Sequence, residues 1–411
     1  MKNIILTLII TLPLTLLSQG WEQTYSFVEI EESDFVKPTN DGGFIFTGCS
    51  KPQCHEVLLI KTNSFGDTVW IRSYEININN FNVTDVSAES VVESEDGGFI
   101  ILGDWNDEGQ VYYGGSFIIK TDEYGLLVSL KNLGLDNYGN HLEKTSDNGF
   151  IITGYKIDND YFYTTLNKYT YNGDLEWSKT YYEINSYNDD MGICVQENND
   201  GGFIISTIEG ALIKTNNIGD TLWTKKNYNS YVRQADDNGF ILTTHNELIK
   251  LDENGLEEWA YIYNESVYGR CVQITNDNGY IICGTKQSPQ NDDTSGRDIY
   301  VIKTNLVGDT LWTKKYGNNF SFDAAYTIST CFNEGYIIGG VKTDWGITKT
   351  CLIKIDNNGN ITSTFEIPLT NTNKILKKTI SLKGQEIKPQ KNNPIIEIFN
   401  DGSVEKKIII E

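Results

Sequence analysis

The sequence has few of the residue types that usually build catalytic sites or bind nucleic acid. Its 411 residues include only three histidines, and none has the spacing of a zinc protease or the setting of a catalytic triad: His55, His141 and His245. Lysine and arginine together number 33 against 56 acidic residues, which gives a net charge of -23. Because a phosphate backbone requires a basic protein face, we do not expect nucleic acid as a partner.

Long apolar runs are also scarce. The one candidate, from Ile4 to Leu17, follows Lys2 and precedes small and polar residues, which is the layout of a secretory signal peptide. We assign residues 1–18 to this signal, with cleavage near Ser18. The run is shorter than the roughly 20 apolar residues of a membrane span, so we expect no membrane span in the mature protein.

The sequence has seven cysteines, an odd number, and they do not form the framework of a small disulfide-rich domain. Five of the seven fall inside predicted strands, where cysteine commonly serves as a small buried residue: Cys194, Cys271, Cys283, Cys331 and Cys351. Cys49 and Cys54 flank a short loop and are placed to form a disulfide in an oxidising environment; two loop thiols are the alternative. With only His55 beside them, we predict no metal site.

One phrase occurs seven times and determines the expected fold. It is an Asp-Gly or Asn-Gly turn followed by Phe-Ile-Ile or a close variant, and the copies begin at Asp41, Asp96, Asp147, Asp200, Asp237, Asp277 and Asn333. The turn supplies the positive φ of tight hairpins, and consecutive apolar residues indicate a strand covered on both faces. The copies are 37 to 56 residues apart, a spacing typical of propeller blades.

Three further strands can be placed in each repeat. An apolar stretch precedes the turn, a segment such as Leu58-Leu-Ile-Lys-Thr follows the phrase, and a glycine turn leads to a strand that usually holds a tryptophan, such as Trp70. We therefore predict an all-β fold. It consists of a seven-bladed β-propeller of four-stranded antiparallel blades over residues 21–366, a linker over 367–373 and a small β-module over 374–411.

Two segments compete to complete the last blade. Residues 21–27 contain Trp21 and Tyr25 and look like the outer strand that holds Trp312, whereas residues 359–366 fit the same place with a serine instead of tryptophan. A strand from the N-terminus would close the ring and remove its open sheet edges, so we favour residues 21–27.

The repeat and the tail resemble two known families. The repeated units resemble the Asp-Gly-Gly-Phe-Ile type β-propeller repeats common in secreted proteins of Bacteroidetes, which implies a propeller but no activity. Residues 374–411 contain Gly384-Gln-Glu386 and end in Asp401-Gly-Ser-Val-Glu-Lys-Lys. They resemble the C-terminal sorting domain of the type IX secretion system, although Lys383 stands where leucine is usual; an incidental capping hairpin is the alternative. The resemblance implies the type IX machinery as a partner and a protein that is secreted or attached to the outer cell surface.

The loops between the second and third strands of the blades are expected to carry the ligand site. They vary in length, whereas the opposite face consists of uniform turns, and variable loops on a rigid scaffold usually hold binding residues. Aromatic rings beside carboxylates suit a sugar or a cation-bearing surface; the alternative is that the rings pack on blade edges. The candidates are Asp104, Trp105, Tyr112, Tyr113, Tyr155, Asp158, Tyr161 and Trp345.

These features predict a binding or adhesion protein, a monomer that takes a glycan or protein ligand and uses no cofactor. We identify no catalytic residue, and Arg233 and Arg270 would have to converge to give a sialidase-like site. Turns such as residues 356–360 would suit calcium but lack the spacing of a calcium loop, and turn chemistry explains them. The alternative functions are a carbohydrate-active hydrolase or lyase with its site in the central funnel, and a structural spacer.

Overall fold

The computed structural model describes residues 20–30, 35–50, 54–78, 81–107, 114–182, 190–228, 231–263, 267–287, 296–317, 321–332, 334–344, 346–361, 376–381, 394–399 and 404–408. The chain divides into two compact units, Met1–Thr362 and Ser363–Glu411. The predicted signal peptide, residues 1–18, and the predicted linker, residues 367–373, lie outside the described residues. In the described part of the chain, no helix has the length and apolar character needed to span a membrane.

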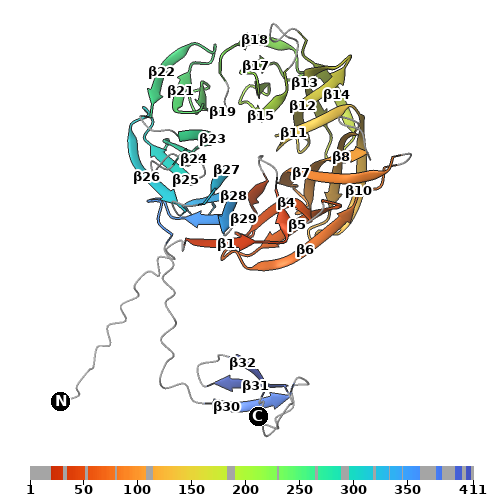
Figure 1. Ribbon diagram of the computed structural model, residues 1–411, viewed down its shortest axis with the longest axis vertical. Coiled ribbons are helices and arrows are strands. Elements are labelled where there is room, and N and C mark those ends of the chain that lie inside the picture. Colours follow the sequence, from red (N-terminus) through yellow and green to blue (C-terminus); the bar gives the residue numbers. More distant parts are fainter. Residues whose placement is uncertain are drawn as a thin grey trace, which may run out of the picture. The chain divides into compact units, whose positions relative to one another are not determined.

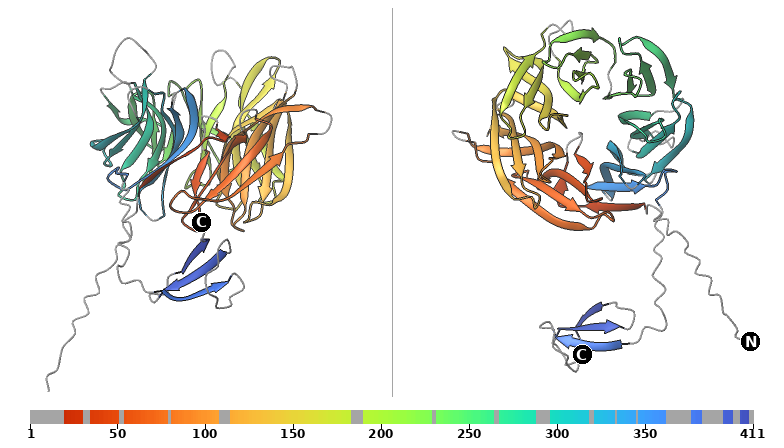
Figure 2. Two further views of the ribbon diagram at one scale, coloured as in Figure 1. Left: turned by 60° about the horizontal axis from the view of Figure 1, so that its bottom comes forward. Right: turned by 180° about the vertical axis from the view of Figure 1, so that it is seen from behind.

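The first unit is a ring of seven antiparallel sheets, each with its first strand at the centre and its last at the rim (Figures 1 and 2). Blade 1 contains β3 (Val36–Pro38), β4 (Phe44–Ser50), β5 (Glu56–Thr62) and β6 (Thr68–Glu75), and β2 (Val28–Glu29) pairs with the far end of β4. Blade 2 contains β7 (Val83–Glu93), β8 (Phe99–Asp107), β9 (Gly114–Thr121) and β10 (Leu127–Leu135). Blade 3 contains β11 (Asn137–Lys144), β12 (Phe150–Asp158), β13 (Tyr161–Tyr169) and β14 (Leu175–Thr180).

The remaining blades follow the same order. Blade 4 contains β15 (Gly192–Glu197), β16 (Phe203–Thr207), β17 (Leu212–Thr215) and β18 (Thr221–Lys225). Blade 5 contains β19 (Tyr231–Gln234), β20 (Phe240–Thr243), β21 (Glu247–Leu251) and β22 (Glu257–Ile262). Blade 6 contains β23 (Val267–Ile274), β24 (Tyr280–Gln287), β25 (Arg297–Thr304) and β26 (Thr310–Tyr316). Blade 7 contains β27 (Ala324–Thr330), β28 (Tyr336–Asp344), β29 (Ile347–Ile355) and, from the other end of the chain, β1 (Trp21–Tyr25).

The predicted seven-bladed propeller is therefore confirmed. The second unit is described by itself as a three-stranded antiparallel sheet in the order β30 (Leu376–Ser381), β31 (Pro394–Phe399) and β32 (Val404–Ile408).

The repeated phrase forms the turn between the first and second strands of every blade. Its second residue has a φ between 60° and 82° in all seven copies: Gly42, Gly97, Asn148, Gly201, Asn238, Asn278 and Glu334. The aromatic residue and the two apolar residues after it begin the second strand, and none of them is more than 4% exposed. Both faces of this strand are thus covered by neighbouring blades, as the consecutive apolar residues predict.

A tryptophan and a tyrosine on the outer strand hold each of several blades to the next one. In blade 1, the ring of Trp70 packs edge-on against Phe99 of blade 2 at 5.9 Å between centroids, and the Tyr74 hydroxyl donates a 2.7 Å hydrogen bond to the Gly125 carbonyl. A Cβ atom on Gly125 would lie 2.8 Å from the Trp70 ring. The glycine before the outer strand is therefore required by close packing as well as by its positive φ.

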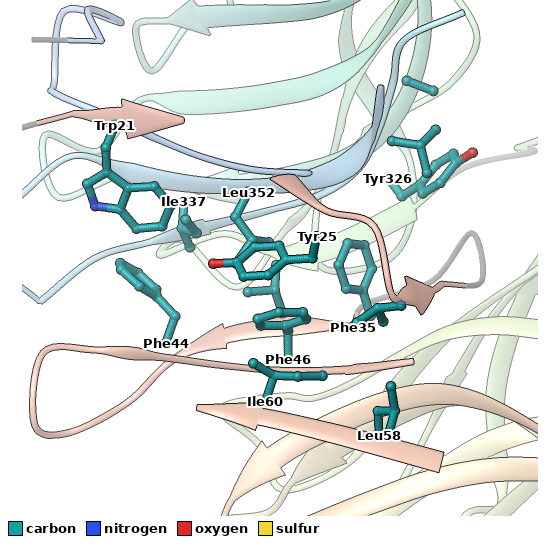
Figure 3. Packing of buried hydrophobic residues seen from close by; sticks show 14 of the residues in the cluster. Trp21, Tyr25, Phe35, Phe44, Phe46, Leu58, Ile60, Tyr326, Ile337 and Leu352 are labelled. Carbon is teal, nitrogen blue, oxygen red and sulfur yellow. The ribbon is translucent and has the colours of Figure 1, made fainter. Parts of the chain in front are cut away.

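The ring closes through the same contact. Strand β1 pairs with β29, Trp21 packs against Phe44 of blade 1 at 5.5 Å, and the Tyr25 hydroxyl donates a hydrogen bond to the Gly66 carbonyl at 2.9 Å (Figure 3). The preference for residues 21–27 over residues 359–366 is confirmed for β1, because Gly359 lies in the turn after β29 and packs on Trp312. Residues 362–366 lie outside the described part of the chain.

Replacing Trp21 with alanine is expected to lower the free energy of unfolding by about 3–5 kcal/mol, the usual cost of truncating a buried large aromatic side chain. Urea unfolding of the full chain measures this change. Trp223→Ala removes the equivalent contact between blades 4 and 5, where Trp223 packs on Phe240, and should cost a similar amount. Gln23→Ala, at an exposed position of the same strand, is the control, and an equal effect of Trp21→Ala and Gln23→Ala would refute closure by β1.

Candidate functional site

Asp104 and Trp105, two of the candidates in blade 2, belong to a strand instead of a loop, because β8 continues through them to Asp107. The Trp105 ring is fully buried against Phe81 at 4.7 Å, and its Nε1 donates a hydrogen bond to Asn132 at 3.3 Å. Asp104 is half-buried and accepts a hydrogen bond from the Ser116 hydroxyl. The structure thus places Trp105 in the core between blades 1 and 2. Tyr112 and Tyr113, which follow in the same loop, lie outside the described residues, as does Trp345 in blade 7.

The candidates in blade 3 lie on one long hairpin. Strands β12 and β13 have nine residues each and are joined by Asn159 and Asp160, both with positive φ, which is the geometry of a two-residue hairpin turn. Tyr155 is half-buried, stacks on Tyr138 at 4.9 Å and meets Phe162 edge-on. Asp158 and Tyr161 pair across the turn.

Three tyrosines form an open strip on this hairpin. Tyr161 and Tyr163 are two residues apart on β13 and therefore project from the same face, with 6.4 Å between their ring centroids. Tyr182, just beyond β14, lies 4.8 Å from Tyr163. The side chains of Tyr161 and Tyr182 are 48% and 59% exposed. We call these three residues the tyrosine strip.

Only Tyr161 of the tyrosine strip was among the candidates drawn from the sequence. Two signals in the sequence point to the others: Tyr163 follows Tyr161 at the two-residue period of a strand, and Tyr182 comes directly after the outer strand of the same blade. Neither signal reveals that the two rings meet, because residues 163 and 182 are brought together by the register of β13 on β14, in which Thr165 pairs with Thr180.

A groove lies between blades 3 and 4. It is on the opposite face of blade 3 from the rings of Tyr161 and Tyr163, because Leu166 and Tyr181 face blade 4 and the strip residues alternate with them along β13 and β14. It has a volume of about 390 Å³ and is lined by Thr180, Tyr181, Tyr182, Ile213, Thr221, Thr224 and Lys226. Tyr182 therefore belongs to the groove and to the strip. The Tyr181 hydroxyl joins the two blades by donating to the Gly219 carbonyl at 2.9 Å.

The groove arises where a tall blade meets a short one. The second and third strands of blade 3 have nine residues each, whereas those of blade 4 have five and four. The second and third strands of blade 3 thus extend beyond those of blade 4, whereas the outer strands β14 and β18, which border the groove, have six and five residues. The difference in loop length between these blades is visible in the sequence.

The candidate disulfide is present at another point of the same face. Cys49, in β4, and Cys54, just before β5, are joined in a disulfide. The Glu29 carboxylate lies near both sulfur atoms, but disulfide sulfurs are not the thiolates that bind metal ions. The other five cysteines are buried thiols; four lie within strands and Cys331 directly follows β27.

The arginines near the central channel have separate partners. Arg233 of β19 is 5% exposed, contacts the Cys194 sulfur of β15 at 2.9 Å and lies 3.6 Å from the Glu143 carboxylate of β11. It thereby links the inner strands of blades 3, 4 and 5. The Arg270 guanidinium instead lies 5.9 Å from the centre of the Tyr326 ring. Each of these contacts ties inner strands together.

Buried lysines pair with the turn aspartates at the face opposite the loops. In six blades, a lysine of the third strand, 2–8% exposed, reaches the carboxylate that opens the repeated phrase, with nitrogen to oxygen distances of 2.7–3.8 Å: Lys61, Lys120, Lys168, Lys214, Lys250 and Lys303. The seventh, Lys354, is also buried, but its blade has Asn333 in place of the aspartate, outside the described residues. Four of the six paired lysines lie in an Ile-Lys-Thr triplet, whereas Lys168 lies in Asn-Lys-Tyr and Lys250 in Ile-Lys-Leu.

These pairs lower the pKa of the turn aspartates. Burial alone would raise the pKa of Asp147, but hydrogen bonds from Lys168, from the Thr145 hydroxyl and from the Gly149 backbone outweigh it and hold that pKa at about 2. The pKa is also lowered, against burial and by similar partners, for Asp41, Asp96, Asp200, Asp237 and Asp277. The uniform face therefore has a structural role.

The free energy of unfolding should fall as the pH is lowered from about 4 towards 2. In this window the unfolded aspartates take up protons, whereas the folded ones, with lowered pKa values, remain charged, so acid favours the unfolded state. Asp147→Asn should make the loss between pH 4 and pH 2 smaller, as measured by urea unfolding at a series of pH values. Asp309→Asn, on an exposed turn, is the control. An unchanged pH profile for Asp147→Asn would count against the effect.

Comparison with known proteins shows the fold alone. No family model and no curated protein matches the chain. Among solved structures, a streptogramin B lyase has a TM-score of 0.51 at 11% identity, covering 82% of this chain and 98% of its own. Virginiamycin B lyase from Staphylococcus aureus has a TM-score of 0.50 at 11% identity, covering 82% and 100%. BBS1N in complex with ARL6DN has a TM-score of 0.51 at 7% identity, covering 84% and 100%.

Proposed function

We propose that the protein is a binding or adhesion propeller, exported through the type IX secretion system, whose ligand lies on the loop face. The observation that carries the proposal is the tyrosine strip. Two of its rings, Tyr161 and Tyr182, are exposed, and the half-buried Tyr163 contacts both. Exposed aromatic groups on a rigid scaffold are typical of binding sites. The two faces of the ring also differ. One face has the same buried ion pairs in six blades, whereas the loops of the other face vary from blade to blade, as is usual for binding loops on a rigid scaffold.

The tail supports the export part of the proposal. Its three described strands form a small antiparallel sheet in a unit separate from the propeller, as a detachable sorting module would. The sequence likeness of residues 374–411 to type IX sorting domains is the reason to assign this role. The hydrolase or lyase and the spacer remain alternatives, since the resemblance to the two lyases extends to the fold and no further.

Removing residues 374–411 should stop export after the inner membrane. In a host with a type IX system, we expect the full chain at the cell surface or in the medium and the shortened chain in the periplasm, as followed by fractionation and immunoblotting. Cooperative urea unfolding of the periplasmic form shows whether the propeller still folds. If the shortened chain reaches the surface as the full chain does, the sorting role is excluded.

Ligand binding should depend on the tyrosine strip. We expect the full chain to bind an array that carries glycans and extracellular matrix proteins, and the double variant Tyr161→Ala, Tyr182→Ala to lose about tenfold or more in affinity. Tyr124→Ala is the matched control, because Tyr124 is 59% exposed, as Tyr182 is, but lies on a turn of the uniform face. Equal loss in the control and the double variant, or no binding to any spot, would overturn the proposed site.

A further inference from the structure

The groove between blades 3 and 4 is polar along its length. Apart from Ile213 its lining consists of threonine, tyrosine and lysine side chains, and it runs along β18 from Thr221 at the start to Lys226 just beyond the end. Thr221, Thr224 and Lys226 are exposed, so their hydroxyl and ammonium groups are open to a bound molecule. At about 390 Å³ the groove is within the size range of small-molecule sites, about 300–1,000 Å³.

The strip and the groove together offer the two kinds of contact that a sugar chain makes. A pyranose ring has an apolar face of C–H groups, which packs on an aromatic ring, and a rim of hydroxyls, which require hydrogen-bonding partners. Tyr161, Tyr163 and Tyr182 supply the rings. Beyond Tyr182, the threonine hydroxyls can donate or accept hydrogen bonds, and the Lys226 ammonium group donates.

Charge decides which sugar chains can approach. The first twenty residues carry +1 and the segment from Leu369 carries +3, so the chain between them carries -27. Such a surface repels polyanions over about a Debye length, roughly 8 Å at physiological salt. Among the described residues that line the groove, Lys226 is the one that is charged, and one ammonium group does not offset this repulsion. Sulfated and uronic acid polymers are therefore disfavoured.

We infer that the ligand of this site is a neutral polysaccharide, which lies on the tyrosine strip, crosses the outer edge of blade 3 at Tyr182 and continues along the groove between blades 3 and 4. This inference rests on the proposed function and names its ligand class. It also assigns the groove residues Thr224 and Lys226, which lie on blade 4, to a site whose other half is on blade 3.

Affinity electrophoresis of the full chain tests the inference. Native gels contain a soluble neutral polysaccharide (mixed-linkage glucan, xylan or mannan) or an acidic one (alginate or heparin). We expect at least one neutral polymer to slow migration, at low and at high salt, and the acidic polymers to leave it unchanged. Thr224→Phe fills the groove and should weaken the retardation about tenfold or more. Thr313→Phe is the matched control, since Thr313 is exposed and follows Trp312 as Thr224 follows Trp223.

The outcomes separate this inference from the proposed function. Retardation by acidic polymers only, or binding to matrix proteins only that is sensitive to Tyr182→Ala, would overturn the neutral polysaccharide while leaving the loop face as the binding site. Retardation by a neutral polymer that Thr224→Phe and Thr313→Phe weaken equally would remove the groove from the site. Cooperative urea unfolding of both variants at the wild-type midpoint excludes a folding defect as the cause.

Discussion

Every blade of this propeller depends on having another blade on each side. The first three residues of each second strand are apolar and at most 4% exposed, so a single blade in water would expose both apolar faces of its core. Closing the ring covers both faces of all seven blades, each of which remains a separate sheet. The tryptophan and tyrosine at the rim, and the buried lysine and aspartate beneath the turns, repeat because they serve this one requirement.

Much of this arrangement could be predicted from the sequence, because it is expressed in local spacing. The turn residues with positive φ, the consecutive apolar residues and the tryptophan strand recur in register, and Trp21 could be recognised as a displaced copy of the same strand. The buried ion pairs could not be assigned in the same way. Lys61 and Asp41 are twenty residues apart, and only the pairing of β4 with β5 brings them together. A lysine within an apolar strand gives no indication of its partner.

The candidate site could be predicted in part. Loop length identified the loop face and the hairpin of blade 3, and Tyr161 is open to solvent there. Trp105 also lies among acidic residues and was expected in a loop. Instead, strand β8 extends through it to Asp107, and Phe81 covers its ring. The tyrosine strip depends on the register of β13 on β14, and the groove depends on the packing of blade 3 against blade 4, so both became visible only in the structure.

The pairing of β1 with β29 also determines when the ring can close during synthesis or export. These strands are the first and the last of the propeller, so a chain that emerges from a ribosome or a secretion channel N-terminus first presents Trp21 and Tyr25 long before their partners exist. Until Leu352 and Lys354 are added, β1 has no partner strand and the blades at the two ends of the open ring have uncovered apolar faces, features that promote misassociation. The ring can therefore close only after blade 7 has been made. A chain that is truncated before blade 7 cannot form the pair of β1 and β29.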